Sequence, residues 1–593
     1  MRPAVAAGVA LLLAAHGGAA AAPPTPAAHL RVNLAGYRPS DGKVALLFGE
    51  RPLRGSFTVR RDGGTRPAIR ARLPAASAGS WGRFPHHYAL DLTSLHEPGT
   101  YVIEAAGASA RFSVDRGALR PWPGYLLEYL RQQRCGYNPF LDVVCHPFDG
   151  RSAYGPLPAG SYVDARGGWH DAGDQLKYLI TASNATAQLL MAWQLRPSAF
   201  DDQVDALGRP GPNGDADVLD EARWGLEWML RLHPAPDQLY HQVADDRDHI
   251  GWKLPQDERS DYGWGPGSYR VAYAADGRPQ GLGNFQSKAT GIANLAGRYA
   301  AAMALAHQVF KDHPRHAAFA ARCLQAGREV YALGRGREGF QQGNSFGAPY
   351  RYHEDTWADD MEWGAAELFE ATGERAYLED AVRYARVIGA TSMVGRDTGE
   401  HYQFYPFMNA GHFALSPLVD DATRRELAGH YRENLEAAQG RAARNPYGLG
   451  VPFLWCSNNL AVALATQALM YERMTGDARF RALAEAQRDW LLGRNPWGTS
   501  MFSLVPEGAE APVNVHLSVT HLSRRGVRGG LVDGPVSAAI FAGLKGASTE
   551  GPDLFAAFQG EAVYHDDLLD YSTNEPTMDG TASAVLLFAL LGE

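Results

Sequence analysis

Cysteine is scarce in this chain of 593 residues, which contains four, at positions 135, 145, 323 and 456. Four cysteines are too few to provide a disulfide framework for a protein of this size. Basic runs are also short and the formal net charge is −9, whereas a domain that binds nucleic acid usually carries a basic patch. No apolar stretch reaches the roughly 18 residues that a membrane-spanning helix needs. We therefore expect no nucleic-acid partner and no membrane insertion.

The N-terminus has the pattern of an export signal. Arg2 precedes an apolar run over residues 4–15, and an Ala-rich segment follows at 17–22. One positive charge, a short apolar core and small residues before the cleavage position are typical of a secretory signal peptide. The sequence therefore predicts a signal peptide over residues 1–22 and a secreted or periplasmic protein.

The rest of the chain divides into two patterns. Residues 28–115 form short alternating segments that Gly and Pro interrupt every 8 to 12 residues, which predicts an all-β sandwich. From residue 119 to 593 the apolar residues recur at helical spacing, and Thr-Gly turns at 372–373 and 475–476 join successive helices. About a dozen helices in antiparallel pairs could close into a toroid with the functional loops at one end.

Two acidic segments carry the strongest indication of chemistry. Residues 167–174 read Gly-Gly-Trp-His-Asp-Ala-Gly-Asp and place Asp171 and Asp174 among glycines, while Glu575 lies just before the last apolar helix. Paired carboxylates perform acid–base catalysis when their surroundings separate their pKa values. On spacing alone, a solvated turn or a calcium loop explains the first segment at least as well, and a helix cap explains Glu575.

Together these segments resemble signatures of glycoside hydrolase family 9, a family of inverting β-1,4-glucan hydrolases. Residues 167–174 are similar to its motif Gly-Gly-Trp-x-Asp-Ala-Gly-Asp, and residues 571–575 to its motif Tyr-x-x-Asn-Glu. Residues 360–366 and 493–498 also resemble the family, and residues 31–37 resemble the start of its immunoglobulin-like module. The resemblance implies a mainly α fold, with an (α/α)6 barrel over 119–593 preceded by an immunoglobulin-like β-sandwich over 28–115.

The resemblance also implies roles for the three carboxyl groups. Asp174 would be the general base that activates water, Asp171 would help to hold that water, and Glu575 would be the general acid. In an inverting enzyme the acid and the base stand about 6.5–9.5 Å apart. The acid must stay protonated near neutral pH, and Asp567 and Asp570 are close enough in sequence to supply the negative charge that raises its pKa.

A third group consists of two cysteines and two histidines, namely Cys135, Cys145, His146 and His170. Two thiolates and two imidazoles suit tetrahedral Zn²⁺, but a disulfide between the two cysteines explains the spacing equally well. Some family members look similar here, with a structural zinc whose last ligand directly precedes the first catalytic Asp, and this resemblance favours zinc. A weaker resemblance suggests Ca²⁺ at three carboxylates, Asp355, Asp359 and Asp360. No organic cofactor is expected.

Substrate contacts are predicted with less support. Family cellulases usually carry His-His-Arg after the Asn-Pro motif, whereas residues 512–519 contain a single histidine, His516. Pyranose rings stack on aromatic side chains, and the candidates for this role are Trp169, Trp252, Trp264, Trp357 and Tyr571. Each of these rings is also explained as part of the core.

The sequence therefore predicts an exported, monomeric, inverting hydrolase of β-1,4-glucosidic bonds in β-glucans, of the endoglucanase or cellulase type. Xyloglucan and mixed-linkage glucan are included among the expected substrates. Two alternatives stay open at this stage: an exo-acting β-glucosidase or glucosaminidase on the same scaffold, and a non-catalytic glycan-binding protein.

Overall fold

The computed structural model describes residues 28–267, 269–348 and 352–592. The signal peptide predicted over residues 1–22 lies outside this part of the chain. Within the described residues, no helix combines the length and the apolar composition that crossing a membrane requires.

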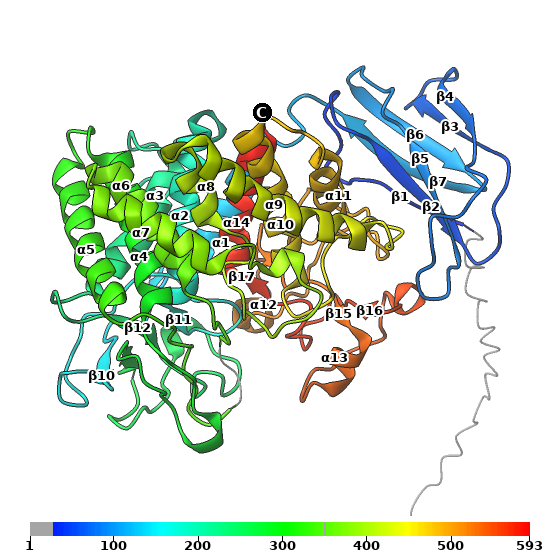
Figure 1. The fold of residues 1–593 in the computed structure, drawn as a ribbon. Coiled ribbons are helices and arrows are strands. Elements are labelled where there is room, and N and C mark those ends of the chain that lie inside the picture. The colour runs from blue at the N-terminus through cyan, green and yellow to red at the C-terminus, as the bar shows by residue number, and fades with distance from the viewer. Residues whose placement is uncertain (1–27, 268, 349–351, 593) are drawn as a thin grey trace, which may run out of the picture.

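A β-sandwich forms the N-terminal part of the structure (Figure 1). One sheet has the strand order β1-β2-β5 and the other β4-β3-β6-β7, with antiparallel neighbours. Alternate residues such as Val59, Ile103 and Phe112 fill the space between the sheets, as period-2 patterning predicts. The strands are β1 (His29–Arg31), β2 (Val44–Gly49), β3 (Ser56–Arg61), β4 (Pro67–Arg72), β5 (His86–Asp91), β6 (Gly99–Ala105) and β7 (Ala108–Val114).

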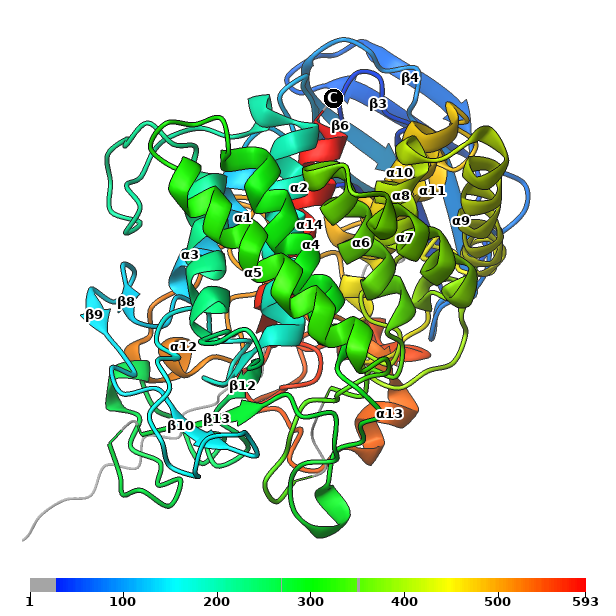
Figure 2. The same ribbon diagram turned by 60° about the vertical axis from the view of Figure 1, so that its left-hand side comes forward.

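Helices in two concentric layers form the larger part of the described chain (Figures 1 and 2). The inner helices contact one another in sequence order, and the last of them closes the ring against the first. They are α2 (Leu179–Leu195), α4 (Ala293–Phe310), α6 (Ala358–Thr372), α8 (Ala410–Leu415), α10 (Ser457–Thr475) and α14 (Met578–Leu591). The outer helices are α1 (Trp122–Gln132), α3 (Asp217–Arg231), α5 (Ala317–Gly336), α7 (Arg375–Ile388), α9 (Asp421–Ala442) and α11 (Arg481–Leu491).

The two layers differ in composition. The inner helices α4 and α14 are rich in Ala and Leu and are buried along almost their whole length, as expected for helices covered on every side. The outer helices α7 and α11 bury one face and expose the other. Helices that are apolar all round need cover on every side, and the outer helices provide that cover with their buried faces. The predicted ring of helix pairs follows from this difference.

The loops that precede the inner helices gather at the end of the barrel that lies at the bottom of Figure 1. They include a small sheet in the order β10-β13-β12-β11 and two short helices, α12 (Ser518–Ser523) and α13 (Ala538–Gly543). The strands of that sheet are β10 (Arg151–Ala153), β11 (Lys177–Tyr178), β12 (Tyr240–Val243) and β13 (Val271–Ala274). The predicted acidic segments lie in these loops.

Buried polar contacts fix the sandwich to the barrel. Arg488 of α11 lies 2.8 Å from Asp41 and 2.8 Å from Asp489, and all three side chains are almost completely buried. The amide of Asn33 donates to Asp489 over 2.9 Å. The domains therefore share one continuous polar and apolar interface rather than a flexible linker.

Candidate active site

Asp171 lies at the centre of the loop that leads into α2. It is 1% exposed, and its two carboxylate oxygens accept hydrogen bonds from Thr181 (2.5 Å) and from the hydroxyl of Tyr352. Its main-chain carbonyl accepts from Met578, the first residue of α14. Burial and the neighbouring Asp174 raise the pKa of Asp171 well above its usual range.

Asp174 occupies the other end of the same turn and has a histidine beside it. Its Oδ1 accepts from the main-chain amide of Leu176 over 2.8 Å. Its Oδ2 lies 3.3 Å from Nε2 of His249, in the loop that follows β12. Although burial opposes it, the Asp174 carboxylate raises the pKa of His249.

Glu575 reaches the same loop from the far end of the chain. The main-chain amide of Gly173 donates to its Oε1 over 2.8 Å. Burial, followed by the charges of Asp533 and Asp174, raises the pKa of Glu575 well above its usual range. The site thus places a carboxyl group that holds its proton beside two other carboxyl groups, which is the arrangement that acid–base catalysis requires.

The acidic neighbour of Glu575 differs from the expected one. Asp570 accepts hydrogen bonds from His565, Ser572 and Thr573 at 2.6–2.7 Å, and despite burial these contacts lower its pKa. Its charge is therefore already balanced. Asp533, which the sequence did not single out, is the acidic neighbour whose charge raises the pKa of Glu575, and burial raises the pKa of Asp533 itself to about 8.

Two predicted stacking residues belong to the core. Trp169 is 1% exposed and its indole N–H donates to Glu221 over 2.7 Å, so its ring is unavailable to a sugar and this prediction is wrong. Trp357 is half-buried and packs edge-on against Tyr384 of α7, among the residues between α6 and α7. Its prediction as a sugar platform has no support in this packing.

His516 and Tyr571 lie at the site. The Cδ2 and carbonyl oxygen of His516 border Gly173 on the side where Glu575 also approaches. Its Nδ1 is 2.6 Å from the carbonyl oxygen of Leu568, so this nitrogen carries the proton and Nε2 is left as an acceptor. The ring centroid of half-buried Tyr571 is 6.1 Å from that of His516 and 5.6 Å from that of Trp455. The ring centroid of Trp252 is 4.8 Å from that of His516. These rings form an aromatic border beside Glu575.

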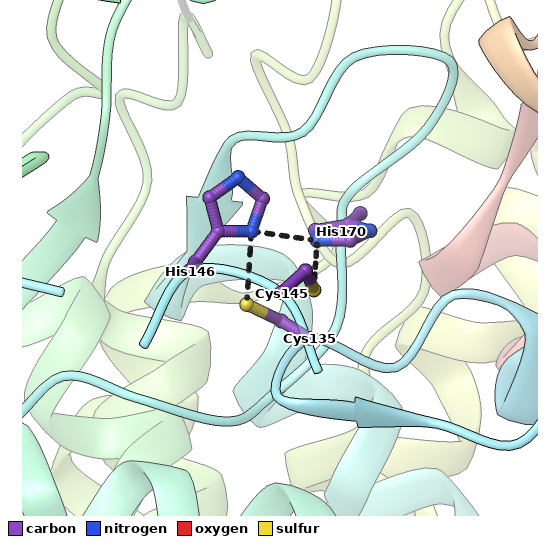
Figure 3. Close-up of side chains that lie close together, drawn as sticks. All are labelled: Cys135, Cys145, His146 and His170. Atoms are coloured by element: carbon purple, nitrogen blue, oxygen red, sulfur yellow. Dashed lines mark hydrogen bonds between the residues drawn. The ribbon is translucent and has the colours of Figure 1, made fainter. Parts of the chain in front are cut away.

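The four predicted metal ligands converge (Figure 3). Sγ of Cys135 is 3.5 Å from Nδ1 of His146, Sγ of Cys145 is 3.7 Å from Nε2 of His170, and the two nitrogens are 3.4 Å apart. Each of the four ligand atoms lies within 4.8 Å of the others, all four residues are buried, and both cysteines are free thiols. His146 also has a φ of +48°, a strained conformation typical of functional sites.

The predicted calcium ligands do not converge. Among the described residues, the groups of three or more side chains with metal-binding atoms within 4.8 Å of one another exclude Asp355, Asp359 and Asp360. Asp360 lies 3.3 Å from Arg298 instead, and exposed Asp355 accepts from Gln403 over 3.0 Å. A buried arginine takes the position that this prediction gave to a cation.

Comparison with known proteins decides the family. The model of glycosyl hydrolase family 9 matches residues 124–588, and that of the cellulase N-terminal ig-like domain matches residues 25–110. The chain belongs to glycosyl hydrolase family 9. The two helical layers are therefore the (α/α)6 barrel of this family, and the sandwich is its immunoglobulin-like domain, as the sequence predicted.

Family 9 relatives resemble the chain over most of its length. A metagenome-derived family 9 endoglucanase of known structure is 27% identical, with a TM-score of 0.76 over 95% of this chain and 99% of that one. A xyloglucan-specific endo-β-1,4-glucanase of Bacteroides ovatus is 24% identical over 95% of this chain and 93% of the relative. Endoglucanase 1 of Oryza sativa subsp. japonica is 27% identical, and the match spans 60% of its length.

Four residues at this family 9 site were missed by the sequence analysis: Thr181, His249, Tyr352 and Asp533. Thr181 and Tyr352 hold Asp171, whereas His249 and Asp533 adjoin Asp174 and Glu575. Asp533 follows the apolar residues Leu531 and Val532 and precedes Gly-Pro, so a polar residue at a strand end was a usable signal. His249 and Tyr352 lie far from the motifs in sequence, and Thr181, although close to the first motif, is part of the apolar start of α2 and carries no comparable pattern.

Proposed function

We propose that this protein is an inverting endo-β-1,4-glucanase in which Asp174 is the general base and Glu575 the general acid. The observation that carries this proposal is the contact across Gly173, which brings a carboxyl group with a raised pKa to the loop that holds Asp171 and Asp174. A protonated carboxyl can protonate the leaving oxygen, while an ionised one facing the other side of the sugar ring can deprotonate water.

The two aspartates have different surroundings and therefore different roles. Both oxygens of Asp171 are occupied by hydroxyl donors, so its carboxylate fixes the turn and helps to orient the water. Asp174 instead has the imidazole of His249 at 3.3 Å, and we assign it the role of the base. The base accepts a proton from water as the water attacks the anomeric carbon, and Glu575 gives its proton to the departing sugar.

The stereochemistry of the first product tests this proposal. Because the water attacks from the face opposite the leaving group, a β-linked oligosaccharide should yield the α-anomer first, which proton NMR during early turnover can detect. Initial appearance of the β-anomer would indicate a covalent intermediate and would overturn the role of Asp174. A parallel sample without enzyme corrects for spontaneous mutarotation.

The proposed substrate is a soluble or accessible β-1,4-glucan, including xyloglucan. The printed activities of the similar proteins support this choice, since they are endoglucanases and one is xyloglucan-specific. Viscosity and reducing-end assays on cellulose derivatives, mixed-linkage glucan, xyloglucan and chitosan would separate endo from exo action. A fall in viscosity well ahead of the release of reducing ends is expected, because internal cleavage shortens the chain at each event.

We further propose that the four-residue cluster holds a structural Zn²⁺. Zn–S bonds of about 2.3 Å and Zn–N bonds of about 2.0–2.1 Å place sulfur and nitrogen ligands about 3.5 Å apart on a tetrahedron. The S–N separations of 3.5 and 3.7 Å fit that figure. The N–N separation of 3.4 Å fits the value of about 3.3–3.4 Å that two Zn–N bonds at the tetrahedral angle give. Since His170 directly precedes Asp171, the ion would brace the catalytic turn.

Export belongs to the same proposal. The signal pattern of residues 1–22 and a polysaccharide substrate both suit a monomeric protein outside the cytoplasm. N-terminal sequencing of the protein recovered from the periplasm or culture medium would test it, with processing near Ala22 as the expected result.

A further inference from the structure

Asp533 and Glu575 are cross-strand neighbours. The short strands β14 (Leu531–Val532) and β17 (Pro576–Thr577) pair antiparallel, with Val532 opposite Pro576. One step further along the ladder, the main-chain amide of Asp533 donates to the carbonyl oxygen of Glu575 over 2.9 Å. Directly opposed residues project from the same face of a sheet, with their Cβ atoms about 4.5–5.5 Å apart. The two carboxyl groups therefore face the same space.

Uncharged donors hold the Asp533 carboxylate in place. The indole N–H of Trp455 donates to Oδ2 over 2.7 Å, and the thiol of Cys456 donates to Oδ1 over 3.0 Å. Asp533 is 1% exposed. Burial raises the pKa of Asp533 to about 8, whereas the hydrogen bonds from Cys456 and Trp455 oppose this rise and favour its ionised form.

Two opposed, buried carboxyl groups cannot both ionise at low cost, so the pair retains a proton. The donors to Asp533 direct that proton to Glu575. On Glu575, Oε1 accepts from Gly173, which leaves Oε2 to carry it. The charge of Asp174 also raises the pKa of Glu575, but less than that of Asp533 does.

We propose that Asp533 is a positioning residue of the reaction: in its ionised form it keeps the proton of the pair on Glu575 until the leaving oxygen takes that proton. Asp533 acts through Glu575. The inference rests on the proposed role of Glu575 as the acid. The other titratable groups that face the pair are Asp171, Asp174, Tyr129, Cys456, Asp570, Tyr571 and Asp579.

The test is the pH profile of Asp533→Asn. Asparagine keeps the shape and an oxygen acceptor for Trp455 or Cys456 but removes the charge. The alkaline limb of kcat/KM for an unactivated cello-oligosaccharide reports the acid of the free enzyme, and we expect it to move to lower pH by about one unit or more. The acidic limb should stay in place, and the rate on an activated glycosyl fluoride above the new limb should change little.

The control is Asp421→Asn, which removes a carboxylate on the outer helix α9 whose side chain is 79% exposed. Its pH profile should match the wild type. A purely structural role for Asp533 would lower the rate at every pH without moving the alkaline limb, and that result would overturn the inference. Asp533→Ser serves as a second neutral variant if Asp533→Asn does not fold.

The outcome is separable from that of the proposed function. If Glu575→Gln still cleaves unactivated oligosaccharide, the acid assignment itself fails. If Glu575→Gln is inactive on that substrate while both neutral variants of Asp533 keep the wild-type alkaline limb, only the role of Asp533 fails.

Discussion

The main-chain amide of Gly173 donates a hydrogen bond of 2.8 Å to Oε1 of Glu575, although 402 residues separate them in sequence. A Cβ at position 173 would lie 2.5 Å from that oxygen and 2.4 Å from the carbonyl oxygen of His516. The absence of a side chain is thus what allows the aspartate loop and the glutamate segment to meet. This contact and the hydrogen bond from Met578 to the carbonyl oxygen of Asp171 join the two segments.

Gly173→Ala should therefore lower kcat strongly while changing the unfolding temperature only slightly. The added methyl group must push Glu575 or the His516 segment away, and a displacement of about 1 Å at a reacting group can cost about 100-fold in rate. Steady-state kinetics together with thermal unfolding would measure both effects. Gly429→Ala is the matched control, because a Cβ there meets nothing within 4 Å. Equal losses in the two variants would contradict the proposed contact.

Glu575→Gln should abolish cleavage of substrates with poor leaving groups and retain partial turnover of an activated glycosyl fluoride. The amide cannot donate a proton to the departing oxygen, and fluoride needs less protonation. Comparing kcat on cellotetraose and on the fluoride checks this. Near wild-type cleavage of cellotetraose by the variant would contradict the acid assignment.

The same substitution should change how stability depends on pH. The pKa of Glu575 is raised in the folded state, first by burial, so the folded state binds its proton more tightly than the unfolded chain. The resulting stability is fully present below the ordinary carboxyl pKa and is lost as pH rises through the folded value. Relative to the wild type, Glu575→Gln should therefore become more stable at alkaline than at acidic pH in chemical unfolding. The reverse trend would mean that Glu575 is ionised in the free enzyme.

Cys145→Ser should remove about one Zn²⁺ per chain and lower the unfolding temperature. A closed site with four protein ligands leaves no position for substrate. We therefore expect the unfolding temperature to fall clearly, while kcat measured well below that temperature should change little. Metal analysis and calorimetry provide the measurements, with Cys323→Ser as a control because that buried thiol is outside the cluster. A Cys135–Cys145 disulfide found by mass spectrometry of the unreduced protein would defeat the zinc proposal.

Arg488→Met should weaken the junction between the sandwich and the barrel. It leaves Asp41 and Asp489 buried without their shared partner, and breaking a buried ion pair typically costs about 3–5 kcal/mol of unfolding free energy. Urea unfolding would measure the loss. Arg60→Met, which breaks a half-exposed pair with Glu104, is the control and should leave the unfolding midpoint almost unchanged.

The helical period predicted the barrel, and the alternating segments of residues 28–115 predicted the sandwich. The three carboxyl groups and the preference for zinc at the two cysteines and two histidines followed from the resemblance of several motifs to glycoside hydrolase family 9. These features are readable because each depends on local spacing: the apolar period sets the helices, and the ligands cluster around one loop. The aromatic predictions were less reliable, and Trp169 was wrong, because a tryptophan reads the same whether it faces the core or the solvent. Its burial depends on Glu221 in α3, which lies 52 residues away.

What the sequence determined by itself is the list of ionisable groups and the elements that carry them. The tertiary structure decided which of these groups share a space. Asp570 lies within five residues of Glu575, yet its charge is taken up by His565. Asp533 acts on Glu575 only because β14 pairs with β17. Electrostatic influence depends on distance and burial in space, and chain proximity does not supply either.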